Sequence, residues 1–259
     1  MICSRHLRCG TVACALIVLP AGLPAQTKPL PVPRPLVAVY RFGWQSVPAA
    51  RATVRLRHVA GNRIEVSADA ATFGMARSVW QMDATYRSEI EGTSLLPHEA
   101  EQVEMYRKKR VTTRLTFTPK EVVRDRTVTV GGRTEGRPRR FRTPLARDLV
   151  GALLWVRAQP LRAGESYALT VFPAASPYLA RARVAGRESI RIRGRTVDAI
   201  RVELDLRGLQ PDGSTTAVKK LRRARAWLSD DADRVVVRAE ADVFIGSVVA
   251  ELDRVEFEP

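Results

Sequence analysis

The residues best suited to acid–base or metal chemistry in this sequence are two of its three histidines, His58 and His98, because the third, His6, lies within a predicted signal peptide. His98 begins the segment His-Glu-Ala-Glu-Gln, which is similar to a helical zinc-protease motif. That motif needs a second histidine four residues later, and Gln102 stands there instead. A serine–histidine–acid triad would need one of the same two histidines, and no Gly-x-Ser-x-Gly segment is present to favour it. We therefore predict no catalytic residue, no metal site and no cofactor.

Pairs of nearby carboxylates are the other group that could act as acid and base. Glu99 with Glu101, and Asp230 with Asp231, are examples, and each pair has arginines close by in the sequence. Solvated ion pairs are the simpler interpretation. The alternative is an acid–base pair that hydrolyses a glycosidic bond, which needs two carboxyl groups about 5–10 Å apart.

The first 25 residues have the features of a secretory signal. Arg5 and Arg8 precede a short apolar run over residues 11–19, and a stretch of small residues ends at Ala25. The run is shorter than the roughly 20 residues that span a bilayer, and no later segment is long and uncharged enough to do so. We predict a signal peptide over residues 1–25, export to the periplasm and no integral membrane span after cleavage. The alternative is that the segment stays in place as an N-terminal membrane anchor.

All three cysteines of the chain, Cys3, Cys9 and Cys14, lie within this predicted signal. The mature chain is therefore expected to contain no cysteine. That prediction excludes thiol catalysis, disulfides and cysteine-ligated metals from the mature protein.

The chain is basic, with 43 lysines and arginines against 27 acids and a formal net charge of +16. Most of the basic residues are arginines spread along the sequence, and two clusters lie at residues 107–110 and 219–225. Neither cluster is interleaved with the aromatic residues on which single-stranded nucleic acids stack. We predict a solvated, arginine-rich surface and no nucleic-acid partner, with an anionic envelope surface as the alternative contact.

Two kinds of segment must position these residues. Residues 26–35 alternate with proline and predict an extended linker. From residue 36 to residue 259, apolar and polar residues alternate with a period of two, which is typical of half-buried antiparallel strands. Turn signals separate roughly a dozen such strands, so we predict a single antiparallel β domain over residues 36–259.

One segment breaks the alternation and predicts a helix over about residues 144–158. Thr143 is suited to cap it and Pro144 to occupy its first position, while Pro160 ends it. Its apolar stripe includes Leu149 and Leu153. The fold class that follows is mostly β: a curved antiparallel sheet or an incomplete β-barrel with this one helix packed on it.

Four tryptophans, Trp44, Trp80, Trp155 and Trp227, lie in well-separated segments that could converge inside a curved sheet. With Leu149 and Leu153 of the predicted helix they are our candidates for the lining of an apolar ligand cavity. The alternative is that they pack in a solid core.

Several ordered motifs resemble those of a known family. They are residues 40–48, the helix opened by Asp148, the segment Trp-Leu-Ser-Asp-Asp at residues 227–231 followed by Arg234-Val235, and residues 245–252. Together they resemble domain-of-unknown-function family 3108, a family of uncharacterised exported bacterial proteins. This chain departs from the pattern at Ala49-Ala50 and at Val236, which affects strand geometry. The resemblance implies a periplasmic, mostly antiparallel β domain, and it brings no catalytic residues.

These observations predict a non-enzymatic periplasmic protein that binds an apolar or lipid-like ligand or supports envelope maintenance. Two alternatives stay open. One is a hydrolase of envelope polysaccharide that uses a carboxylate pair, and the other is a protein-interaction module that offers a sheet edge to a partner.

Overall fold

The structure is a computed structural model that describes residues 31–44, 47–218, 221–243 and 246–258. The predicted signal peptide and the first half of the predicted linker lie outside the described residues. Residues 31–35 have no regular secondary structure, and the sheet begins at Leu36.

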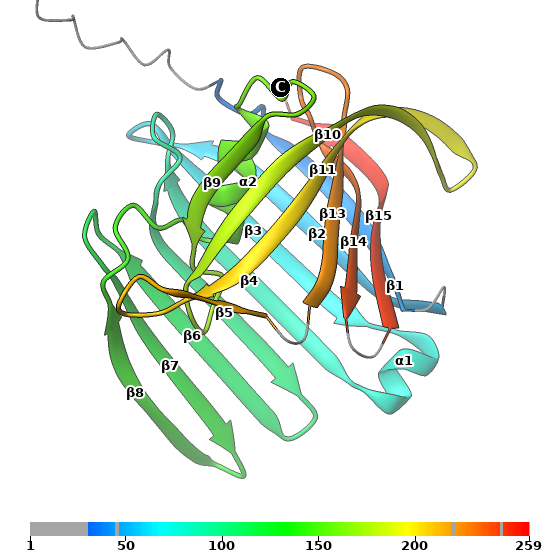
Figure 1. Cartoon of the computed structure of the whole chain (residues 1–259). Helices are drawn as coiled ribbons and strands as arrows, with labels where there is room; N and C mark the ends of the chain where they lie inside the picture. The colour runs from blue at the N-terminus through cyan, green and yellow to red at the C-terminus, as the bar shows by residue number, and fades with distance from the viewer. Residues whose placement is uncertain (1–30, 45–46, 219–220, 244–245, 259) are drawn as a thin grey trace, which may run out of the picture.

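The described chain forms one antiparallel sheet with two wings, which meet where β1 pairs with β15 (Figure 1). The N-terminal wing comprises β1 (Leu36–Trp44), β2 (Val47–Val59), β3 (Arg63–Thr72), β4 (Met82–Glu91), β5 (Pro97–Tyr106), β6 (Lys109–Phe117), β7 (Val122–Val130) and β8 (Arg133–Phe141). The C-terminal wing comprises β9 (Ser166–Val171), β10 (Tyr178–Ile192), β11 (Arg195–Leu209), β12 (Thr215–Ala217), β13 (Leu221–Ser229), β14 (Val236–Val243) and β15 (Gly246–Phe257).

The strand order shows that this sheet is open. It runs from β8 back to β1, then through β15, β14, β13, β11 and β10 to β9, and β12 pairs with β11 beside this path. Strands β8 and β9 are therefore the two ends of the sheet and do not pair with each other. The prediction of a mostly β fold with a curved, unclosed antiparallel sheet is confirmed.

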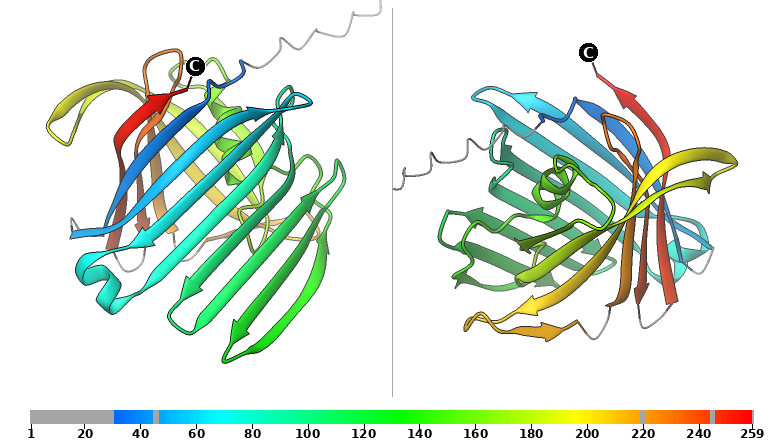
Figure 2. Two further views of the ribbon diagram at one scale, coloured as in Figure 1. Left: turned by 180° about the vertical axis from the view of Figure 1, so that it is seen from behind. Right: turned by 45° about the horizontal axis from the view of Figure 1, so that its top comes forward.

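The period of two gives the sheet two chemically different faces. We call the face on which helix α2 (Leu149–Arg157) lies the inner face, and the opposite one the outer face (Figure 2). Directly paired residues of neighbouring strands share a face. One inner-face row runs across β1 to β8 through Leu36, Leu56, Val66, Ser88, Ala100, Leu115, Arg124 and Arg139.

Helix α2 packs between the two wings. Leu154 lies in a buried cluster with Leu36 and Leu56 of the N-terminal wing. Ala152 and Val156 lie in another cluster with residues of β9, β10 and β11. The helix is therefore apolar on several sides, as expected for one enclosed by sheet rather than laid on a surface.

The predicted packed helix is present, but it begins five residues later than the predicted residue 144. Leu145 has a φ of 51°, which a right-handed helix does not accommodate, and Arg147 forms an isolated bridge with Val171 of β9. Asp148 is the residue that caps the helix, in place of Thr143. A second, short helix, α1 (Gly74–Val79), joins β3 to β4 and has no counterpart among the elements predicted from the sequence.

In the described part of the chain, the structure contains no helix of the length and hydrophobicity that a membrane span requires.

Candidate ligand-binding cavity

An apolar cavity of about 650 Å³ lies between helix α2 and the inner faces of both wings. Its volume falls in the range of about 300–1,000 Å³ that is usual for small-molecule sites. The walls come from α2, from β1 to β3 of the N-terminal wing, and from β9, β10, β11, β13 and β14 of the C-terminal wing, with Pro173 and Val218 from the connections between strands. The lining residues are Leu36, Val54, Leu56, Val66, Leu149, Val150, Ala152, Leu153, Leu154, Val156, Arg157, Leu169, Val171, Pro173, Tyr178, Ala180, Ala182, Val202, Leu204, Leu206, Val218, Ala226, Leu228, Val236 and Ala239.

The cavity wall offers little polar chemistry. Among the described residues that line it, Arg157 and Tyr178 are the only ones whose side chains carry polar atoms. Water gains few hydrogen-bond partners in such a space, whereas an apolar group loses only its contact with water. The cavity is therefore suited to an aliphatic or aromatic ligand.

Leu149, at the first turn of α2, is a cavity-lining residue that the protein leaves largely uncovered. Its side chain is 62% exposed although it is one of the cavity-lining residues. A leucine loses about 1.5–3 kcal/mol of favourable burial energy when it is left exposed. A ligand that covered Leu149 would recover part of that energy.

The N-terminal end of α2 is fixed by Asp148, whose side chain is fully buried. Its Oδ1 accepts a hydrogen bond of 2.6 Å from the backbone N–H of Gly151, which caps the helix. Its Oδ2 accepts a bond of 2.5 Å from the Tyr86 hydroxyl and another from the Ser88 hydroxyl, both on β4. The carboxylate thus ties the start of the helix to the middle of the N-terminal wing.

Burial raises the pKa of Asp148 above its ordinary value, and the hydrogen bonds from Ser88, Tyr86 and Gly151 offset only part of that rise. A carboxyl group in such a place could suggest a catalytic acid. Here all of its partners are donors from the protein scaffold, and it is absent from the residues that line the cavity. We assign it a structural role in positioning α2.

Gly151 makes this tight anchoring possible. A Cβ atom at this position would lie 2.8 Å from Asp148 Oδ1 and 3.1 Å from the Leu95 carbonyl oxygen. Any larger residue would push the first turn of α2 away from β4 and β5.

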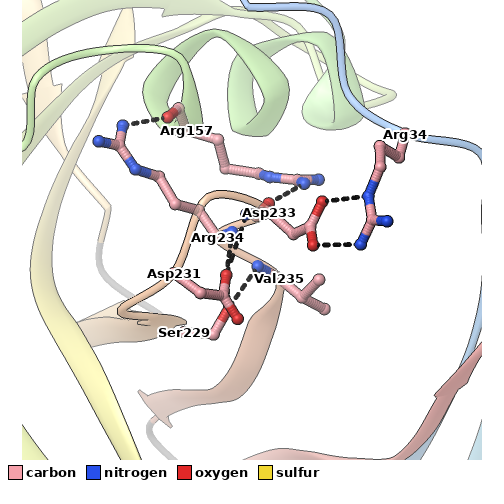
Figure 3. Close-up of polar contacts among 7 residues, drawn as sticks. All are labelled: Arg34, Arg157, Ser229, Asp231, Asp233, Arg234 and Val235. Carbon is pink, nitrogen blue, oxygen red and sulfur yellow. Dashed lines mark hydrogen bonds and ion pairs between the residues drawn. The ribbon is translucent and has the colours of Figure 1, made fainter. Parts of the chain in front are cut away.

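The C-terminal end of α2 is held by the loop between β13 and β14 (Figure 3). Arg234 donates hydrogen bonds to the carbonyl oxygens of Arg157, at 2.5 Å, and of Gln159. The Asp231 carboxylate accepts bonds of 2.8 Å from the Ser229 hydroxyl and 2.9 Å from the Arg234 backbone, which fixes the loop. Arg234 thus satisfies carbonyls that the end of a helix leaves free.

The same loop binds Arg157 and the end of the linker (Figure 3). Arg157 donates to the Asp233 carbonyl oxygen, and Arg34 donates to both carboxylate oxygens of Asp233, at 2.8 Å and 2.6 Å. The motifs at Asp148 and at residues 227–235 are therefore joined in space, at the two ends of one helix. The contacts of these two motifs hold helix α2 in position, and α2 forms one wall of the cavity.

Of the six residues predicted to line a cavity, the structure places Leu149 and Leu153 in its wall. Trp155 is partly buried in α2, edge-to-face with Tyr167 at 6.1 Å between ring centroids. Trp44 is 45% exposed at the end of β1. Trp80 is 57% exposed beside α1 and stacks on Tyr106.

Trp227 is buried, but its neighbours in the sequence are the ones that face the cavity. Ala226 and Leu228 line it, and the alternation of β13 turns Trp227 to the outer face. There its indole N–H donates a hydrogen bond of 2.7 Å to Glu188. The four tryptophans therefore do not converge.

The residues weighed for acid–base chemistry lie apart from the cavity. His58 Nε2 is 2.7 Å from the Pro33 carbonyl oxygen, and His98 is exposed on β5. Glu101 forms an ion pair with Arg114, and Asp230 forms one with Arg187 at 2.9 Å. No group of three histidine, cysteine or acidic side chains that could hold a metal occurs among the described residues.

Sequence reasoning missed most of the cavity wall, above all the alanines and valines of β10, β13 and β14. Small apolar residues such as Ala180 and Ala182 alternate with arginines along β10. This alternation of alanine with arginine was the signal present in the sequence. It indicates that β10 places small side chains on the inner face, where they leave space beside the strand.

Comparison with known proteins identifies the chain's relatives. The sequence pattern of a family described as "Protein of unknown function (DUF3108)" matches residues 38–253. A search of curated proteins finds no significant match.

The similar solved structures are distant in sequence. A β-barrel-like protein of the domain of unknown function DUF1849 from Brucella abortus matches with a TM-score of 0.59 and 10% identity, over 87% of this chain and 98% of that one. The lipoprotein LppX of Mycobacterium tuberculosis matches with a TM-score of 0.27 and 13% identity, over 88% of each chain. A protein from Bacteroides fragilis, described as exported and YmcC-like in fold, matches with a TM-score of 0.32 and 9% identity, over 88% and 98%. The first likeness shows the fold, and the other two are too weak to carry an argument.

Proposed function

The chain belongs to the DUF3108 family, and we propose that it binds an apolar, lipid-like ligand in the cavity between helix α2 and the two wings of the sheet. The observation that carries this proposal is a cavity of about 650 Å³ with an almost wholly aliphatic wall. Its residues come from three separate parts of the fold and are held in place at both ends of α2. A site of this kind recognises its ligand by burial of apolar surface.

The proposal includes where the protein acts. Residues 1–25 carry the features of a secretory signal, so we place the ligand in the periplasm, where acyl chains of envelope lipids need shelter from water. The folded unit that binds it is the single domain from residue 36 onward, preceded by the proline-rich linker.

A neutral fluorescent probe tests the proposal, because its binding does not depend on attraction to the charged groups of the protein. Purified, exported protein is titrated with N-phenyl-1-naphthylamine, which fluoresces strongly in apolar surroundings. We expect saturable binding that the double substitution Leu149→Trp with Leu153→Trp weakens at least tenfold, because both indoles would occupy the cavity. Leu149 lines the cavity and is 62% exposed, so the protein itself does not cover this position and a larger side chain can be accommodated there.

A matched control adds the same two side chains elsewhere. Met75→Trp with Val79→Trp places them on α1, where the native residues are 82% and 84% exposed. This variant should bind the probe in the cavity like the wild type. Absence of saturable binding to the wild type, or equal binding by the cavity variant with unchanged thermal stability, would overturn the proposal.

A further inference from the structure

Four arginines face one another across the strand pair β7–β8. Arg124 lies directly opposite Arg139, and Arg126 lies directly opposite Arg137. They line a hollow of about 700 Å³ at the end of the N-terminal wing, which we call the arginine groove. Like charges placed directly opposite each other destabilise a sheet. Two such pairs side by side therefore suggest that the arginines have a role other than stabilising the fold.

The arginine groove is on the same face as the cavity. Arg124 and Arg139 are the last two members of the inner-face row that begins with Leu36 and Leu56 in the cavity wall. Arg126 and Arg137 occupy the same face one step along the strands. One continuous face of the sheet is thus apolar under α2 and cationic at its edge.

These four arginines lack acidic partners. No ion pair among the described residues includes any of them. The acidic residues on this part of the inner face are Glu135 in the wall of the groove and Glu104 on β5, and neither forms one. The cluster therefore keeps a net positive charge.

Arg124 also links the groove to the cavity. Its guanidinium donates to the Ala175 carbonyl oxygen, and Pro173 of the same loop lines the cavity. Residues two apart in a chain have Cα atoms within about 7 Å of each other. The groove and the cavity are therefore within the length of one amphiphilic molecule.

The state of Arg124 fits an incomplete site. Its Nε is buried without a partner, and its guanidinium lies 5.3 Å from the centroid of the Phe141 ring. Burial, followed by the charges of Arg139 and Arg126, lowers the pKa of Arg124. An oxyanion placed among these side chains would supply both a hydrogen-bond acceptor and the missing negative charge.

We infer that the arginine groove binds the anionic headgroup, a phosphate or similar oxyanion, of the lipid-like molecule whose chain occupies the cavity. This inference rests on the proposed function and makes it more specific. Guanidinium groups bind such oxyanions through paired hydrogen bonds, and their density here suits a group with several oxygens.

Two lysolipids with the same acyl chain test the inference. Binding of lysophosphatidylglycerol, which is anionic, is compared with binding of lysophosphatidylcholine, which has no net charge, below their critical micelle concentrations. We expect the wild type to bind the anionic lipid at least tenfold more tightly. Arg126→Gln with Arg137→Gln should abolish that preference and leave the affinity for lysophosphatidylcholine unchanged, while Arg124 stays in place to hold the loop.

The matched control removes two charges from the outer face of the neighbouring strand. Arg110→Gln with Arg114→Gln changes the net charge equally, so it should keep the preference of the wild type for the anionic lipid. If the control loses that preference as the groove variant does, the attraction is diffuse and the inference is wrong.

The remaining outcomes separate the two proposals. If neither lysolipid binds, the proposed function fails, and if both bind with equal affinity, the inference alone fails. Inorganic phosphate is titrated as a third ligand. Phosphate binding as tight as that of lysophosphatidylglycerol would make the groove a free-anion site and overturn its assignment to a lipid headgroup.

Discussion

On the outer face of the sheet, Arg183 lies directly opposite Glu203 at 3.2 Å, and Arg225 lies directly opposite Glu240 at 2.6 Å. On the inner face, Arg124 lies opposite Arg139, and Arg126 lies opposite Arg137. Both sets of pairs have the same antiparallel strand geometry, and each pair contains at least one arginine. They differ in the residue that lies directly opposite each arginine on the neighbouring strand, which is a glutamate on the outer face and another arginine on the inner face.

That difference separates two uses of the same residue. The arginines of these two outer-face pairs are neutralised within the protein and support strand pairing, and an exposed pair such as Arg183–Glu203 contributes about 0–1 kcal/mol. The inner-face arginines are placed where they weaken the sheet unless something else neutralises them. A high net charge is therefore a poor guide to function, whereas unpaired charge on a face that also holds an apolar cavity is informative.

The comparison between the two faces can also be made for acidic residues. Substitution of the buried Asp148 is expected to have the largest effect on the free energy of unfolding. Asp148→Ala removes a helix cap worth about 1 kcal/mol and leaves the Tyr86 and Ser88 hydroxyls without their acceptor, at about 1 kcal/mol or more each. We expect a loss of about 3 kcal/mol in the free energy of unfolding, measured by urea denaturation. The outer-face control Glu203→Ala should lose less than about 1 kcal/mol. Equal losses would show that the inner acid is no more structural than the outer one.

The pH dependence of stability provides a second test at the same residue. The folded-state pKa of Asp148 is raised, so between its unfolded value near 4 and that folded value the folded state binds more protons than the unfolded chain. Stability contributed by this group is then greatest below the unfolded pKa and falls as the pH rises through this interval. Asp148→Asn can keep the cap but leaves the Tyr86 and Ser88 hydroxyls without a second acceptor oxygen, so it should be less stable overall; because it does not titrate, its stability should lack the fall with rising pH that the wild type shows above pH 4. Parallel stability profiles for the two proteins would contradict this.

The sequence predicted the open antiparallel sheet and the presence of one packed helix because both depend on local periodicity. It could not place the start of that helix. Thr143 and Pro144 form a good local start signal, but the buried cap at Asp148 requires Tyr86 and Ser88, which are about sixty residues away in the chain. A tertiary contact of this kind outweighs a local preference of about 1 kcal/mol.

The candidate site was only partly predictable for a related reason. Size suggested the tryptophans, yet in Ala226-Trp227-Leu228 the alternation gives the cavity to the smaller residues. The cross-strand arginine pairs follow from the Gly131-Gly132 turn, which joins β7 to β8. Their location on the cavity face depends on the register of β6 against β7, which no single segment reveals.

The smallest expected effect is the most direct measure of the contrast between the two faces. Arg126→Gln with Arg137→Gln removes one like-charge pair and relieves Arg124 and Arg139 of nearby positive charge. We expect the unliganded protein to gain about 0.5–1 kcal/mol in unfolding free energy at low ionic strength. Arg183→Gln on the outer face loses an ion pair instead, so it should cost up to about 1 kcal/mol.

Salt distinguishes electrostatic relief from a change in packing. At 1 M ionic strength the Debye length is about 3 Å, so the gain from the groove variant and the loss from the outer variant should both shrink toward zero. A gain that persists in high salt would come from packing or strand propensity, and the arginine groove would then carry no stored repulsion. A groove variant that loses stability at low salt would break the comparison, because the inner arginines would then support the fold as the outer ones do. The predicted pattern, opposite signs at low salt that converge at high salt, requires that these four arginines remain unneutralised until a ligand is bound.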